Sequence, residues 1–168
     1  MERSQWYIGA QNGIVLCIDQ VEDGQTSGRF YHKYKEDATA FATTDQMLFQ
    51  FEHFFDMMDF PHPGNIERSF RRAGMQRKRE LKKAEKMSDK EMLQKHGKLG
   101  TFIVRVQHRQ NSSWQGRITW MERNSTLYFR SVWEMVKLIA GVVEGGQECD
   151  GGWEEQEVAW FGVLEGRA

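Results

Sequence analysis

The feature that most constrains the fold is a repeat: the stretch Gly28–Glu52 returns without a gap, 88 residues later, as Gly116–Ala140. Only four of the forty residue pairs between positions 13–52 and 101–140 are identical, so the argument depends on the pattern. In both stretches apolar residues alternate over short runs and then recur at helical spacing. The change of spacing coincides with matched capping boxes, in which Thr43 precedes Gln46 and Ser131 precedes Glu134.

This pattern predicts an α+β protein made of two tandem, duplicated βββα units, each an antiparallel sheet covered by one helix. The first helix is expected over about Thr44–Asp59 and ends before Pro61 and Pro63. The apolar stripes of the two helices are Met47, Leu48, Phe51, Phe54, Phe55 and Met58, and Met135, Val136, Ile139, Val142 and Val143. The alternative is that two unrelated α+β segments share the same general pattern.

Turn signals divide each unit into strands. Asn12-Gly13 between two apolar runs predicts a hairpin that pairs Trp6–Ala10 with Ile14–Gln20. After a loop over Val21–Ser27, further strands are expected over Gly28–Tyr34 and Ala38–Ala42. The second unit is expected to form strands from Thr101, over Trp114–Glu122 and over Thr126–Arg130, with turns at Asn111–Ser113 and Arg123–Ser125.

Charge divides the chain further. Residues 67–98 contain twelve Lys or Arg against five acidic residues, whereas residues 144–168 contain seven acidic residues and one Arg. We therefore predict a first unit over 1–63, a basic helical linker over 64–99, a second unit over 100–146 and an acidic, aromatic tail over 147–168. The linker is read as one or two exposed helices or, alternatively, as disordered chain, and the tail as a possible extra strand.

Composition limits the class of protein. The net charge of −1 argues against a uniformly basic nucleic-acid coat, and Cys17 and Cys149 form neither a disulfide framework nor a zinc site. No leader or membrane-spanning run is apparent. These features predict a soluble cytoplasmic protein without a cofactor and without a membrane partner.

Strand parity predicts a basic outer face. If the helix covers the face that carries Phe102, Val104, Val106, Ile118, Trp120, Leu127 and Phe129, the intervening residues face outward. The candidate nucleic-acid contacts on these outer faces are Arg105, Arg109, Arg117, Arg123, Tyr128 and Arg130, together with Arg29, Tyr31 and Lys33 of the first unit. Arginines and tyrosines on an open sheet can hold phosphates and stack bases. The same arginines could instead only keep an exposed strand soluble.

An enzyme is not indicated. His53, Asp56, Asp59 and His62 lie close together in sequence, but they lack the spacing of a known metal site. Cys17 falls in a strand, and no histidine can be assigned to activate it. No glycine-rich phosphate loop opens a helix, so no catalytic residue or metal ligand is assigned.

A resemblance adds to these observations. The segment Arg109–Ile139 contains the motifs RQN, SWQG, TW and FRS, and it resembles a group of small uncharacterised proteins from Firmicutes and their mobile elements. Doubled strand-and-helix units are also similar, more distantly, to the PUR and Whirly folds that bind single-stranded nucleic acid. Those folds have four strands before the helix, whereas the second unit offers three unless the tail supplies another.

Two functional hypotheses follow. The first is a non-enzymatic module that binds nucleic acid, preferably single-stranded, through the basic and aromatic sheet face. The second is a protein-interaction adaptor or inhibitor of phage or mobile-element origin. In that hypothesis the tail residues Trp153, Trp160 and Phe161 contact a protein partner or a second copy of the chain.

Overall fold

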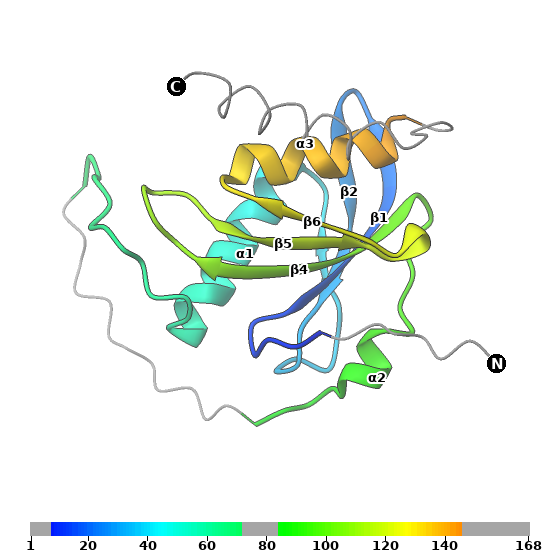
Figure 1. The fold of residues 1–168 in the computed structure, drawn as a ribbon, viewed down its shortest axis with the longest axis horizontal. Coiled ribbons are helices and arrows are strands. Elements are labelled where there is room, and N and C mark those ends of the chain that lie inside the picture. Colours follow the sequence, from blue (N-terminus) through cyan, green and yellow to red (C-terminus); the bar gives the residue numbers. More distant parts are fainter. Residues whose placement is uncertain (1–7, 72–83, 146–168) are drawn as a thin grey trace, which may run out of the picture.

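The described part of the chain forms a single antiparallel sheet of six strands with helices packed against it, an α+β fold (Figure 1). The computed structural model describes residues 8–71 and 84–145. The sheet has the order β3-β2-β1-β4-β5-β6. Its strands are β1 Ile14–Glu22, β2 Gln25–Tyr31, β3 Thr39–Phe41, β4 Gly100–His108, β5 Gln115–Trp120 and β6 Ser125–Phe129. The helices are α1 Thr44–Met58, α2 Asp89–Met92 and α3 Val132–Val143, with a 3-10 turn, η1, at Met121–Arg123.

The two halves of the sheet have the same register. Leu16 pairs with Phe30 between β1 and β2, and the residues 88 positions later, Val104 and Ile118, pair between β4 and β5. Gly28 pairs with Phe41, as Gly116 pairs with Phe129. The irregularities also correspond, since one lies between Ile18 and Gln20 and the other between Val106 and His108. Pairing of Val15 with Ile103 joins the halves through β1 and β4.

The equivalent glycines have an equivalent role. A methyl group on Gly28 would overlap the carbonyl oxygen of Cys17 in β1, and one on Gly116 would overlap that of Arg105 in β4. Both positions therefore require a residue without a side chain, because two backbones approach closely there.

Both long helices begin as the capping signals predict. The Thr43 side chain accepts a hydrogen bond from the Gln46 amide at 3.3 Å, and Ser131 accepts one from the Glu134 amide at 3.1 Å. The return bonds reach one residue further back than the cap: Ala42 N donates to Gln46 Oε1, and Arg130 N donates to Glu134 Oε2. The bonds to Thr43 and Ser131 satisfy amides that the first helical turn cannot pair internally.

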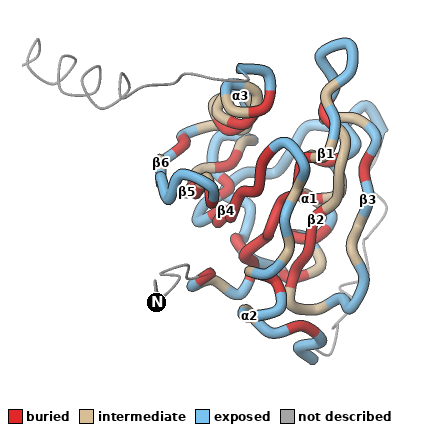
Figure 2. Tube along the Cα trace, turned by 90° about the vertical axis from the view of Figure 1, so that its right-hand side faces the viewer, coloured by how far each residue is buried: buried red, intermediate tan, exposed pale blue. Residues whose placement is uncertain are grey.

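The main core lies between the sheet and the two long helices, as predicted. It includes Phe102, Val104, Val106, Ile118 and Phe129 of the sheet, with Met47, Phe51, Phe54, Phe55 and Met58 of α1 and Met135, Ile139 and Val143 of α3. Figure 2 shows this burial concentrated in the strands and the inner sides of the helices. Alternation in the strands and helical spacing after the caps place these side chains on facing surfaces.

A second cluster covers the opposite face of the first half. Ile8, Met87 and Met92 pack there on Val15, Cys17 and Tyr31. The part of the predicted linker over residues 84–99 contains one short helix, α2, and most of its residues are exposed, but Met87 and Met92 are buried against the sheet. Lys86 N and Met87 N both donate to the carbonyl oxygen of Lys33, which fixes this segment to the end of β2.

The predicted N-terminal hairpin is also wrong. Residues 8–10 are not in a strand. One edge of β1 pairs with β2 and the other pairs with β4, so neither edge is left for such a hairpin. The tight hairpin lies instead at Asp23-Gly24, between β1 and β2, where both residues have positive φ of 50° and 74°. Asp-Gly is a known signal for this turn, so the predicted loop over Val21–Ser27 is shorter than expected.

Candidate functional site: a groove between the two long helices

Two of the arginines expected on an open sheet face are buried. Arg105 donates from Nε to the Ile8 carbonyl oxygen at 2.6 Å and from its terminal nitrogen to Thr119 Oγ1 at 3.1 Å. Burial lowers the pKa of Arg105, and the neighbouring Arg117 lowers it further. The expectation of exposure fails here because Ile8, distant in sequence, lies over this part of β4.

Arg109 is also buried, with 4 % exposure, and holds two elements together. Its Nε donates to the Pro61 carbonyl oxygen at 2.6 Å, and its terminal nitrogen lies 3.0 Å from Glu52 Oε1 and 2.6 Å from Asp56 Oδ1. Trp114 Nε1 donates to the other oxygen of Glu52 at 2.6 Å. The Arg and Trp of the sequence RQNSSW thus fasten the β4–β5 connection to α1, and Arg109 is not a surface contact.

The three candidates of the first half are neutralised or buried. Arg29 forms an ion pair with Asp19 and a hydrogen bond with Tyr31 Oη, and the bond to Asp19 raises the pKa of Arg29. Tyr31 is buried beneath the segment around α2. Lys33 Nζ lies 3.0 Å from Asp89, and that hydrogen bond raises its pKa. This half therefore does not present the expected open basic surface.

The four remaining candidates do not form one platform. Arg117 and the 70 % exposed Tyr128 are cross-strand neighbours on β5 and β6. Arg123 instead lies over Trp120, which packs on the helix-covered side of the sheet. Arg130 pairs with Glu134 at the start of α3. Arg117 and Tyr128 alone keep the predicted combination of a cation and an accessible ring.

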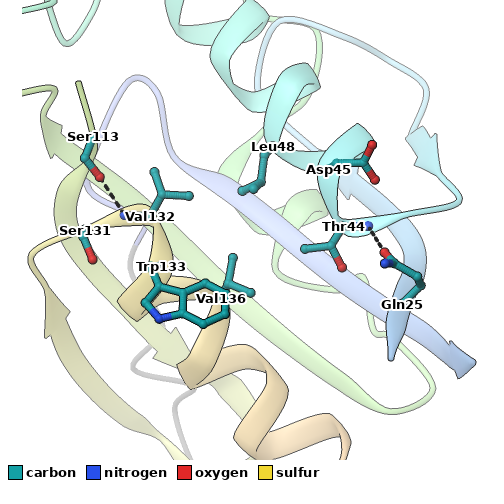
Figure 3. Close-up of a pocket in the computed structure, with 9 residues that line it drawn as sticks. All are labelled: Gln25, Thr44, Asp45, Leu48, Ser113, Ser131, Val132, Trp133 and Val136. Carbon is teal, nitrogen blue, oxygen red and sulfur yellow. Dashed lines mark hydrogen bonds between the residues drawn. The ribbon is translucent and has the colours of Figure 1, made fainter. Parts of the chain in front are cut away.

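A hollow that is open to solvent lies between α1 and α3, on the helix side of the sheet (Figure 3). It measures about 580 Å³ and continues into a second hollow of about 350 Å³ toward Pro63. We call the two together the α1–α3 groove. The first part is lined by Gln25, Thr44, Asp45, Leu48, Ser113, Ser131, Val132, Trp133 and Val136. The second part adds Phe49, Glu52, Pro63, Asn65, Glu67, Arg109, Ser112 and Trp114.

Equivalent positions of the two halves face each other across this groove. Thr44 N donates to Gln25 Oε1 at 3.2 Å, and Val132 N, 88 residues later, donates to Ser113 Oγ at 2.9 Å. Figure 3 shows both bonds and the helix starts that they hold. Leu48 and Val136 are likewise equivalent, and each projects from its helix toward the groove. The groove is therefore built from the first turns of both helices, each fixed by a cap and by a second bond, to the start of β2 for α1 and to the β4–β5 connection for α3.

The two walls differ chemically. Asp45 on α1 is replaced by Trp133 at the equivalent position of α3, and Thr44 by Val132. A hydrogen bond from Thr43 holds the pKa of Asp45 below its usual range, so this carboxylate is charged at neutral pH. Glu67 adds a second acidic group at the far end, whereas the Arg109 charge is compensated by Glu52 and Asp56. The groove thus has an apolar lining and an acidic rim.

Two large aromatic side chains at the border of the groove are exposed to solvent. Trp133 is 68 % exposed and Phe49 is 74 % exposed, although both belong to helices with well-packed inner faces. Together with the half-buried Leu48, Val132 and Val136 they form a continuous apolar surface. Such patches on an otherwise folded surface commonly mark contacts with a partner. The signal in the sequence is that Phe49 and Trp133 are large aromatic residues outside the apolar stripes of their helices.

The remaining predictions concern metals, thiols and the tail. Among residues 8–71 and 84–145, no three His, Cys, Asp or Glu side chains are placed to share a metal ion. His62 pairs with Asp59, with 3.1 Å between Nδ1 and Oδ1. Burial raises the pKa of Cys17 to about 11, which opposes formation of a reactive thiolate. Trp153, Trp160 and Phe161 lie outside the described residues.

Within the described ranges, none of the helices has the length and apolarity needed to cross a bilayer. Comparison with known proteins gave no family model, no curated protein and no solved structure that matches this chain.

Proposed function

We propose that the protein is a non-enzymatic interaction module that binds a protein segment in the α1–α3 groove. The exposure of Trp133 and Phe49 beside Leu48, Val132 and Val136 is the observation that carries this proposal. Burying such side chains against a partner is favourable by about 25 cal/mol per Å² of apolar surface. Aromatic residues are also the usual anchors of protein interfaces.

The groove would owe its origin to an internal duplication, in which two βββα units arose from one ancestor. The common register of both half-sheets, the matched irregularities and the equivalent bonds at Thr44 and Val132 support this origin. Divergence of the two copies, to Asp45 in the first and Trp133 in the second, would then have given the two walls of the hollow different chemistry.

A peptide-display selection on the purified protein tests the proposed function. Selected peptides should bind the wild-type chain and lose about tenfold or more in affinity on Leu48→Glu. Leu99→Glu is the matched control, because Leu99 is an exposed leucine that does not line the groove. Peptides that bind both variants equally would show that the groove is not the binding surface.

Nucleic-acid binding is retained as a second candidate function because of Arg117. Its side chain makes no hydrogen bond or ion pair with the described residues, and its buried Nε has no partner there. The equivalent Arg29 is neutralised by Asp19, whereas Gln107 stands at the position equivalent to Asp19. Arg117 therefore keeps a cation available for a phosphate, beside the exposed ring of Tyr128.

Fluorescence anisotropy with labelled single-stranded DNA, single-stranded RNA and duplex DNA tests this candidate. Binding should prefer single strands, weaken as salt rises and fall by about tenfold on Arg117→Glu. Arg123→Glu changes the charge equally on the other side of the sheet and should have a smaller effect. Equal losses in both variants would indicate attraction by net charge without a site at Arg117.

A further inference from the structure

The segment that follows α1 carries apolar side chains that nothing in the described structure covers. Ile66 is 98 % exposed, and Phe70 is fully exposed. Arg68 lies between them in the sequence Ile66-Glu67-Arg68-Ser69-Phe70. Two large apolar side chains this close together in solvent are unfavourable unless a partner covers them.

The start of this segment is fixed at one end of the α1–α3 groove. Gly64 N donates to the Arg109 carbonyl oxygen at 2.8 Å, and Pro63 forms a bridge with Arg109. Asn65 and Glu67 then line the groove, whereas Ile66 does not. Asn65 and Glu67 thus lie against the groove of their own chain, whereas Ile66 and Arg68 are exposed and do not line it.

The outward residues match the groove in chemistry. Ile66 and Phe70 are suited to the apolar surface formed by Leu48, Val132 and Trp133. Arg68 carries the charge opposite to that of Asp45 on the groove rim. The acidic tail, with six acidic residues over positions 147–168, has the same sign of charge as this rim and is the poorer match.

We propose that two copies of this chain associate, with Ile66, Arg68 and Phe70 of each copy bound in the α1–α3 groove of the other. This inference rests on the proposed function, since it names the occupant of the same groove. The chain cannot place these side chains in its own groove without removing Asn65 and Glu67 from it. A second copy meets no such conflict, and reciprocal exchange closes the assembly as a symmetric dimer.

Sedimentation velocity of the full-length chain over a range of concentrations tests the inference. The wild-type protein should be a dimer. Leu48→Glu alters the groove and Phe70→Glu alters the segment, and each should weaken association by about tenfold or more. Leu99→Glu should leave the dimer intact. Thermal unfolding of each variant ensures that only folded proteins are compared.

Mixing the two variants gives the sharper result. A Leu48→Glu protomer keeps its segment and a Phe70→Glu protomer keeps its groove, so an equimolar mixture should recover a heterodimer with one of the two contacts. A monomeric wild type, or association that is indifferent to Phe70→Glu, would overturn the inference. If display-selected peptides still require Leu48 in that case, the groove binds another protein and only self-association is wrong. If they do not, the proposed function fails as well.

Discussion

His32 shows how the environment of a single residue sets a pH dependence. Its ring is buried and stacks on Phe54 with 4.1 Å between the ring centroids. Tyr34 N donates to His32 Nδ1 at 3.2 Å, which requires an unprotonated nitrogen. Burial lowers the pKa of His32 to about 4, and Lys35 contributes further in the same direction. The folded protein therefore holds this imidazole neutral.

Acidification should destabilise the protein through this residue. The unfolded chain binds a proton near pH 6.5 and the folded chain only near pH 4, so stability falls as pH decreases between these values. The free energy of unfolding should decrease by about 2 kcal/mol from His32 between pH 7 and pH 5. Urea unfolding at several pH values measures it, with His32→Phe as the variant that cannot be protonated. If the free energy of unfolding of that variant falls with decreasing pH as steeply as that of the wild type, other groups cause the pH dependence.

At the scale of elements, Arg109 joins the β4–β5 connection to α1 through Glu52, Asp56 and the Pro61 carbonyl oxygen. Arg109→Leu should lower the free energy of unfolding by about 2–3 kcal/mol, because several charge-assisted bonds are lost at a buried position. The carboxylates regain water, which limits the loss. Chemical denaturation measures the effect.

The matched control for that variant is Arg130→Leu. Arg130 also pairs with a carboxylate, that of Glu134, but in solvent. Its replacement should cost under about 1 kcal/mol, as for most exposed ion pairs. Equal losses in the two variants would contradict a special role for Arg109 in joining these elements.

Elements governed by local chemistry were predictable from the sequence. The caps at Thr43 and Ser131 predict where the two long helices begin. The alternation from Phe102 to Val106 predicts which face of the sheet is buried. Pairing of β1 with β4 was not predictable, since it joins residues about ninety positions apart and has no turn signal. The burial of Arg105 has the same origin, because Ile8 covers it from a distant part of the chain.

At the scale of the whole molecule, the two half-sheets should respond alike to equivalent changes. Gly28→Ala and Gly116→Ala each force a methyl group against a backbone carbonyl of the neighbouring strand, and each should cost roughly 2–3 kcal/mol. Because β1 and β4 join the halves in one sheet, each variant should unfold in a single transition. Thermal and urea unfolding with two spectroscopic probes measure both properties.

Gly141→Ala provides the control for these glycines. Gly141 lies in α3, and an added methyl group there meets no other atom within 4 Å. The variant should be more stable by roughly 0.5–1 kcal/mol, because alanine favours the helix. Two separate transitions, or a large cost at only one of the sheet glycines, would contradict the equivalence of the halves.

The most direct measurement is a map of backbone amide shifts by nuclear magnetic resonance while a display-selected peptide is added to the wild-type protein. The proposed function predicts that the shifts concentrate at the first turns of α1 and α3, around Leu48, Val132 and Trp133. Shifts that concentrate instead on β5 and β6 near Arg117 and Tyr128, with the helix starts unchanged, would contradict the α1–α3 groove as the binding surface.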